Sequence, residues 1–120
     1  MATIKSYTSL EQSKKLTKIL SLESADMYYM ETSYNDYTIG VLQRMERDML
    51  LKQAEYYKMF ACWSLTALFN VLPGGYVIVK NYHGFYYVES RDHSKYTNIF
   101  DNPVDACVNM IEMLHKMNLL

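Results

Sequence analysis

The sequence predicts an α+β fold in which three to four helices pack on a small antiparallel sheet, with residues 1–120 forming a single globular domain. Capped segments with helical periodicity lie near both ends of the chain, and runs rich in β-branched and aromatic residues lie between residues 76 and 90. Half of the residues are hydrophobic, so the chain can bury a core without disulfides or a metal.

The first helix is predicted over residues 10–20. Thr8 and Ser9 are both good N-caps, and Glu11 and Gln12 follow three residues after them, so a capping box can form in either register. Apolar residues then recur at mostly helical spacing, and lysines occupy the other side and the last turn.

Short elements are predicted for the residues that follow this helix. Ser24 can cap a turn at residues 25–27, in which Asp26 caps or buttresses the chain. Residues 28–30 are a brief apolar run that favours an edge strand, and the polar residues 31–36 are typical of a loop.

Residues 37–60 allow two interpretations. Good helix formers dominate residues 42–58, and apolar side chains there have helical spacing, which favours one long helix. The alternative is a hairpin in which residues 37–42 and 56–60 are extended.

A second apolar helix is predicted over residues 63–72. Ser64 is the expected N-cap, and Trp63 is expected in the core. Pro73 and the two glycines after it end this helix, because proline cannot continue a helix and glycine permits a tight turn.

A hairpin is predicted after this turn, with strands at residues 76–82 and 85–90 joined through His83 and Gly84. A third strand is expected within residues 96–100. The last helix has the clearest pattern: Asn102 is its N-cap and Pro103 its first residue. Its apolar stripe consists of Val104, Cys107, Val108, Ile111 and Leu114.

Charge and cysteine content narrow the classes of function. The chain has 12 basic and 13 acidic residues, balanced in both halves, so composition predicts no nucleic-acid or anionic-lipid partner. The N-terminus does not resemble a signal peptide, and no apolar run is long enough to span a bilayer. Cys62 and Cys107 each lie in apolar segments, so we expect free thiols in a reducing cytoplasm.

No motif in the sequence predicts catalytic, cofactor-binding or metal-binding residues. The three histidines and two cysteines lack metal-ligand spacing, and the Pro-Gly-Gly turn lacks the lysine and strand–loop–helix order of a phosphate loop. Cys62 is the best candidate nucleophile, since it precedes a predicted helix N-terminus where the dipole lowers a thiol pKa. A buried structural role for Cys62 is the favoured interpretation.

The aromatic and methionine content suggests contact surfaces instead. The chain has 12 tyrosines and nine methionines, and both residue types suit adaptable interfaces. The preferred surface is the predicted hairpin around Tyr82, Phe85 and Tyr87. A methionine-rich segment is a second possible surface, formed by Met45, Met49 and Met59.

Three parts of the chain resemble a known group. They read TSLEQSKKL with LESADMYY (residues 8–29), CWSLTALFNVLP (residues 62–73) and DNPVDACVNMIEMLH (residues 101–115). In order and spacing they resemble small proteins of unassigned function from gut Bacteroides and from their phages and mobile elements. Such relatives are expected to have proline two residues before the tryptophan, where this chain has Ala61. The resemblance implies an origin and a fold, and no reaction.

Together these observations favour a non-enzymatic interaction protein, such as a phage or mobile-element accessory factor that binds a protein partner or itself. The first alternative is a single-stranded nucleic-acid binder that stacks bases on the tyrosine-rich hairpin. The second alternative is an enzyme with an unrecognised site around Cys62.

Overall fold

The computed structural model describes residues 4–120 and confirms the α+β class, although the strands form two small antiparallel sheets rather than one. In chain order the elements are α1 (Leu10–Thr17), the 3₁₀ turn η1 (Leu22–Ser24), β1 (Met27–Ser33), β2 (Asp36–Val41), α2 (Arg44–Tyr57), β3 (Met59–Cys62), α3 (Leu65–Val71), β4 (Val77–Lys80), β5 (Tyr86–Glu89) and α4 (Pro103–Lys116).

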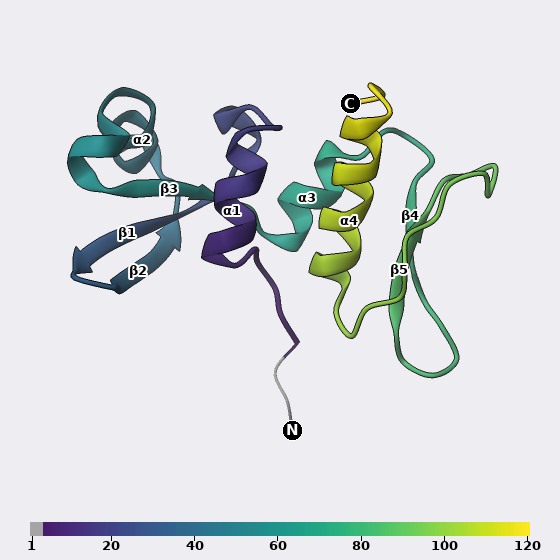
Figure 1. Cartoon of the computed structure of the whole chain (residues 1–120). Helices are drawn as coiled ribbons and strands as arrows, with labels where there is room; N and C mark the ends of the chain where they lie inside the picture. The colour runs from purple at the N-terminus through teal and green to yellow at the C-terminus, as the bar shows by residue number, and fades with distance from the viewer. Residues whose placement is uncertain (1–3) are drawn as a thin grey trace.

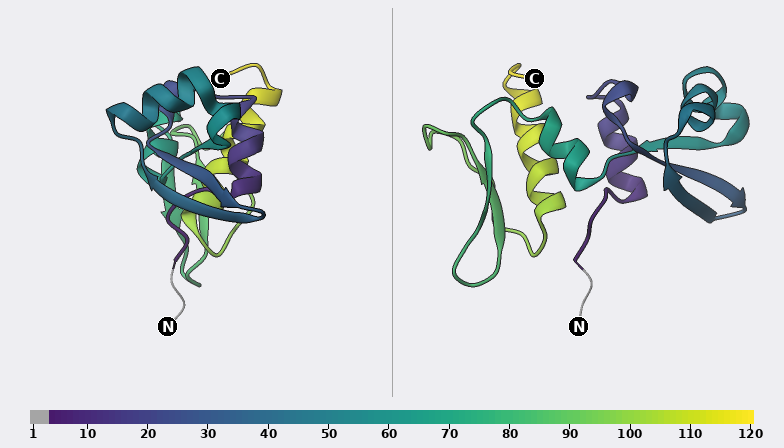
Figure 2. Two further views of the ribbon diagram at one scale, coloured as in Figure 1. Left: turned by 90° about the vertical axis from the view of Figure 1, so that its left-hand side faces the viewer. Right: turned by 180° about the vertical axis from the view of Figure 1, so that it is seen from behind.

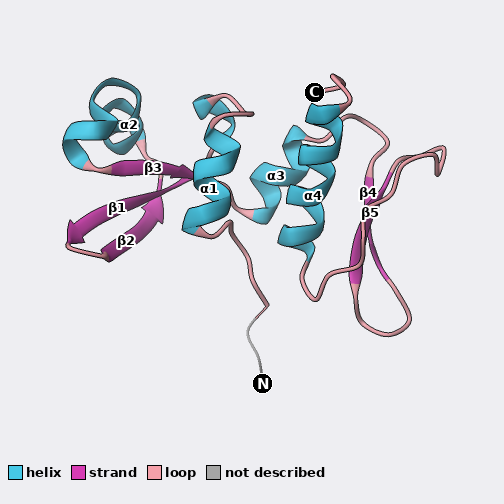
Figure 3. Cartoon of the chain, in the orientation of Figure 1, coloured by secondary structure: helices cyan, strands magenta, loops and turns pink. Residues whose placement is uncertain are grey.

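The two sheets lie at opposite ends of an elongated molecule of 44 × 38 × 22 Å. An N-terminal sheet, in the order β2-β1-β3, carries α2, whereas a C-terminal sheet of β4 and β5 carries α4. Helices α1, α3 and α4 lie between them (Figures 1 and 2). Figure 3 shows that the strands are confined to the two ends of the molecule. No described helix is long and apolar enough to cross a membrane.

Strand β1 is the central strand of its sheet, so the prediction of an edge strand at residues 28–30 was wrong. It pairs antiparallel with β2 on one side and with β3 on the other. It also extends through Ser33, and the predicted loop shrinks to a tight turn in which Asn35 has a φ of 63°. The predicted turn at residues 25–27 is also displaced, since the helical turn η1 precedes it.

Residues 37–60 combine parts of both interpretations. The long helix is correct only for α2, because residues 36–41 form β2 and residues 59–62 form β3. The β-branched residues Thr38, Ile39 and Val41 favour the extended chain. Gly40 lets the Tyr28 ring lie close to β2, since a Cβ atom at that position would lie 2.8 Å from the ring. The hairpin alternative paired the wrong strands, because β2 and β3 both pair with β1.

The predicted helix caps are confirmed. Ser9 and Gln12 form the capping box of α1, although the helix ends at Thr17, earlier than expected. Ser64 Oγ accepts a hydrogen bond from the Ala67 backbone at the start of α3. Asn102 does the same for the Asp105 backbone at the start of α4, with Pro103 in the first turn.

The core lies between the two sheets. Trp63 is fully buried, as predicted, and so is the apolar stripe of α4. The side chains that fill this centre without solvent exposure include Leu16, Cys62, Leu68, Val88, Val104, Met110, Ile111 and Leu114. Cores of this kind supply most of the free energy of folding in a small domain.

The C-terminal hairpin is confirmed, but its turn is longer than the predicted His83–Gly84 connection. The strands stop at Lys80 and resume at Tyr86. Between them, Asn81 Oδ1 accepts hydrogen bonds from the backbones of His83 and Phe85, each at 3.0 Å. An asparagine side chain that replaces backbone partners in this way stabilises the wider turn.

The predicted third strand is present only as isolated pairing. Tyr86 and Phe100 exchange two backbone hydrogen bonds of 2.7 and 2.8 Å, and Thr97 donates to the Val88 carbonyl. This segment therefore protects the β5 side of the C-terminal sheet without forming a regular strand.

A polar seam joins α1 to α4 across the middle of the molecule. Lys5 Nζ donates to Gln12 Oε1 at 2.7 Å and to Asp105 Oδ1 at 2.9 Å. Gln12 Nε2 donates to the same Asp105 oxygen, and Asn102 Nδ2 donates to the other. Because Gln12 and Asn102 belong to the two helix caps, the seam fixes the N-termini of α1 and α4 side by side.

Candidate functional site

The candidate nucleophile Cys62 lies in a closed polar cluster. Its side chain is fully buried, and its Sγ lies 3.5 Å from Thr8 Oγ1 and 3.6 Å from the Thr8 carbonyl. Ser13 and Tyr29 complete the cluster, since Ser13 Oγ lies 2.8 Å from Thr8 Oγ1 and the Tyr29 hydroxyl donates to the Thr8 carbonyl. The cluster ties the N-terminal segment to β1 and β3.

The electrostatics of this cluster run against an activated thiol. Burial raises the pKa of Cys62, and the hydrogen bonds with Thr8 and Ser13 lower it by less. The expected lowering by the α3 dipole is therefore not the dominant effect. Burial alone raises the pKa of Cys107 to about 12. Both cysteines are free and buried, and neither contacts a histidine, so their geometry favours structural roles.

Asp26 and Trp63 hold the start of α3. The Asp26 carboxylate accepts hydrogen bonds from both the backbone and the hydroxyl of Ser64, so it buttresses the N-cap residue of α3 rather than the turn at residues 25–27 to which the sequence assigned it. Trp63 Nε1 donates to Ser24 Oγ at 2.9 Å, which places η1 against the same helix.

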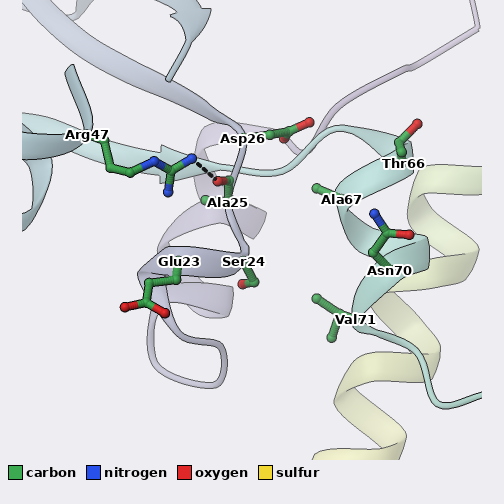
Figure 4. Close-up of a pocket in the computed structure, with 9 residues that line it drawn as sticks. All are labelled: Glu23, Ser24, Ala25, Asp26, Arg47, Thr66, Ala67, Asn70 and Val71. Atoms are coloured by element: carbon green, nitrogen blue, oxygen red, sulfur yellow. Dashed lines mark hydrogen bonds between the residues drawn. The ribbon is translucent and has the colours of Figure 1, made fainter. Parts of the chain in front are cut away.

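A pocket of about 420 Å³ opens beside these residues, between η1, α2 and α3 (Figure 4). Arg47 reaches over its rim and donates to the Ala25 carbonyl at 3.1 Å. Asp26 faces Ser64, so the main charged groups of the pocket already have protein partners. The pocket contains no histidine or cysteine, and its lining residues do not form a nucleophile–base pair.

The three histidines are exposed, whereas both cysteines are buried. His83 sits at the hairpin tip, and His93 Nδ1 lies 3.1 Å from Glu89 Oε2 in an exposed pair. Among residues 4–120, no group of three His, Cys, Asp or Glu side chains is arranged to hold a metal ion.

The three residues of the predicted hairpin surface differ in exposure and in position. Tyr82 is 99% exposed at the tip, whereas Phe85 is 41% exposed and Tyr87 is half-buried. Tyr87 is paired with Val79, and Glu89 with Val77, so side-chain alternation places Phe85 and Tyr87 on the same face as both valines. Tyr82 belongs to the turn and lies outside the paired strands.

The C-terminal sheet therefore has two different faces. Its inner face packs on α4 and contains the core residues Ile78, Tyr86 and Val88. The apolar side chains of its outer face are Val77, Val79, Phe85, Tyr87, Tyr96 and Ile99, and Glu89, opposite Val77, shares this face. In Figures 1 and 2, α4 lies on one side of this sheet, and no described element covers the other.

Four residues of the outer face were missed from the sequence: Val77, Val79, Tyr96 and Ile99. The alternation of residues 76–82 contained the information for the valines, because every second residue shares a face. Tyr96 and Ile99, which are 66% and 58% exposed, were harder to place. Their face follows only from the pairing of Glu89 with Tyr96 and of Tyr86 with Phe100.

The methionine-rich segment does not form one surface. Met45 is exposed on α2, but Met59 is 3% exposed in the core and Met49 is half-buried against it. The prediction of a shared contact surface for Met45, Met49 and Met59 was therefore wrong, because residue 59 belongs to a strand rather than to the helix.

Comparison of the chain with protein families, with curated proteins and with solved structures finds no match. The arguments about function therefore rest on the residues and their geometry.

Proposed function

We propose that this chain is a non-enzymatic protein-interaction module that binds a protein partner through the outer face of its C-terminal sheet. One observation carries the proposal. The solvent-facing side of an antiparallel sheet is normally polar, yet the strands of this one place a single charged residue, Glu89, among aliphatic and aromatic side chains on that side. An exposed apolar face of this kind is typical of an interaction site.

Aromatic residues strengthen this interpretation. Phe85, Tyr87 and Tyr96 provide large rigid contacts of the type that dominates binding energy in protein interfaces. The resemblance to proteins of Bacteroides phages and mobile elements supports an accessory role, in which the partner is a host protein or a protein of the element.

A nucleic-acid surface is less well supported by the charges. Lys80 lies on the inner side of the sheet, with its Nζ 5.8 Å from the ring of Tyr86. The outer face instead carries Glu89, which pairs with His93. A surface that stacks bases needs positive charge along the phosphate backbone, and this face does not supply it.

The proposal is tested by photo-crosslinking in lysate of the source cells. A photoreactive phenylalanine analogue replaces Phe85 in one variant and Tyr34 in another; Tyr34 is 89% exposed on the N-terminal sheet and serves as the matched control. We expect a discrete protein crosslinked from position 85 and not from position 34. The captured protein is then purified and its affinity measured.

The double variant Phe85→Ser/Tyr87→Ser should weaken that binary complex at least tenfold, since aromatic contacts are typical hot spots. Its unfolding free energy should change by no more than about 0.5 kcal/mol per site, as for most surface substitutions. Equal crosslinking from both positions, or an unchanged affinity of the double variant, would contradict the proposal. Loss of the captured material after nuclease treatment would point to nucleic acid.

A further inference from the structure

We infer that β4 is a docking edge for an extended segment of the partner protein, which joins the C-terminal sheet as an antiparallel strand and has an acidic residue two positions before a large apolar residue. The inference rests on the proposed function and adds the binding mode and the partner chemistry. It follows from the backbone of β4, the helix beside it and the charge at its end.

The free hydrogen-bonding groups of β4 belong to Ile78 and Lys80. The Asn81 backbone donates to the Phe85 carbonyl at 2.7 Å, so Asn81 and Phe85 form a hydrogen-bonded pair. Alternation along an antiparallel ladder then turns the N–H and C=O groups of Ile78 and Lys80 away from β5. Among residues 4–120, no hydrogen bond to these backbone groups crosses the open edge.

The opposite edge of the sheet shows how such groups are normally satisfied. Tyr86 and Val88, which lie across from Lys80 and Ile78, bond to Phe100 and Thr97. The third segment thus completes the β5 side, and no segment within residues 4–120 does the same for the β4 side. An edge of this kind is a template for another strand.

Residues of helix α3 and of β4 line one groove. Between this helix and β4 lies the β4 groove, of about 440 Å³, lined by Leu65, Thr66, Phe69, Val77 and Ile78. Phe69 is 41% exposed and Leu65 is half-buried, so the helix presents an apolar flank that its own sheet does not fill.

Register fixes which partner residue enters the groove. The residue directly opposite Ile78 has its side chain on the same face as Ile78, which is the inner face and lines the β4 groove at this edge. A leucine, isoleucine or phenylalanine there would contact Leu65 and Phe69. The residues on either side of it would lie beside Val77 and Val79 and would extend the outer face.

Lys80 supplies the charge preference. It is exposed at the end of β4, and in an antiparallel pairing the residue opposite Lys80 comes two positions before the residue opposite Ile78. Opposite charges across neighbouring strands are favourable. A partner segment of the pattern acidic–any–apolar therefore matches both the charge and the groove, and antiparallel pairing is the more stable of the two strand directions.

The test uses the full chain and a fluorescein-labelled peptide, Ser-Thr-Glu-Val-Leu-Val-Thr-Ser, with binding followed by fluorescence anisotropy. We expect saturable binding that weakens about tenfold when the Leu amide is N-methylated, because that amide faces β4. N-methylation of the Val between Glu and Leu should have little effect, because that amide faces away. Equal effects of the two modifications would overturn the inference.

Two variants of the protein sharpen this test. Lys80→Glu should weaken binding of the Glu-containing peptide about two- to fivefold. It should strengthen binding of a peptide with Lys in place of that Glu by a similar factor. Phe69→Thr should weaken binding about tenfold, whereas Ile39→Thr, at a residue of equal exposure on the open edge of β2, should not.

The outcomes separate this inference from the proposed function. If the peptides do not bind but Phe85→Ser/Tyr87→Ser still abolishes partner binding, the β4 docking mode is wrong and the interaction module remains. If the protein sediments as a dimer that Phe69→Thr or Lys80→Glu dissociates, β4 pairs with a second copy, and the inference of a partner segment is overturned.

Discussion

The two sheets of this protein have a similar architecture but differ in how the second face of each is covered. Each carries a helix on one face and leaves the other face toward solvent. On the N-terminal sheet that second face is covered over β1 and β3, although Ile39 and Val41 of β2 remain 42% and 64% exposed on it. Tyr7, Tyr29, Tyr37 and Phe60 pack in a row with ring centroids 6.5 Å apart, and Lys14 of α1 lies 4.8 Å from the centre of the Phe60 ring.

The C-terminal sheet has no such cover on its outer face. Its aromatic side chains do not pair with one another in the way that the N-terminal row does, and no described segment crosses them. The difference teaches that aromatic content alone does not identify a binding face. Tyrosines locked edge-to-face around a buried hydroxyl are structural, whereas tyrosines on an uncovered face are available to a partner.

The largest effect on stability is expected from Trp63, which lies in the core between the two sheets. Trp63→Ala should cost about 3–5 kcal/mol of unfolding free energy, because it empties a fully buried site and removes the bond to Ser24. Urea denaturation measures this loss of unfolding free energy. Hydrogen exchange in β1 and β5 shows whether one sheet or both lose protection. Trp63→Phe should lose less unfolding free energy than Trp63→Ala, and the variant should remain folded. Protection that falls in β1 alone would mean that the two regions unfold separately.

The seam between α1 and α4 should give the next largest effect. Burial raises the pKa of Asp105, but hydrogen bonds from Lys5, Asn102 and Gln12 outweigh it and hold that pKa below its ordinary value. Because the folded pKa lies below the unfolded value of about 3.9, the carboxylate stabilises the fold above that pH. This contribution is lost as the pH falls through the folded pKa.

Asp105→Asn should therefore cost about 1.5 kcal/mol near pH 7, as for a hydrogen-bonded charge, and the loss of stability in acid should become shallower. Urea denaturation at a series of pH values checks both effects. Asp48→Asn, at an exposed position of α2, is the control and should leave the pH profile unchanged. Identical profiles for Asp105→Asn and the unmodified protein would show that the seam contributes little.

A smaller effect is expected within the covered face of the N-terminal sheet. Tyr29→Phe removes the hydroxyl that donates to the Thr8 carbonyl at 2.7 Å, and should cost about 1 kcal/mol. Tyr37→Phe is the matched control, since the Tyr37 hydroxyl makes no hydrogen bond to a described residue. Thermal unfolding compares the two. Equal shifts in melting temperature would mean that ring packing alone holds this face.

Local signals in the sequence predicted the helix caps and the buried stripe of α4 well. Ser9, Ser64 and Asn102 cap as expected because their hydrogen bonds reach only three residues along the chain. The hairpin was predicted for the same reason, although Asn81 widened its turn.

What failed depended on contacts between distant residues. Residues 37–42 were extended in only one of the two interpretations, and their true partner, β1, lies outside the segment in which that hairpin was sought. Met59 was assigned to a surface because its strand was not foreseen. At the candidate site, Phe85 and Tyr87 were found from composition, but Tyr96 and Ile99 required the register of the third segment, which has no local pattern.

The seam described above also bears on how the chain acquires its structure. Lys5 and Asp105 are separated by 100 positions in the sequence, whereas β1, β2 and β3 pair over much shorter distances. Contacts between such distant residues are slow to form, because a long loop must first close. During synthesis the N-terminal sheet can therefore assemble early, whereas Lys5 and Gln12 can bond to Asp105 only after α4 has left the ribosome.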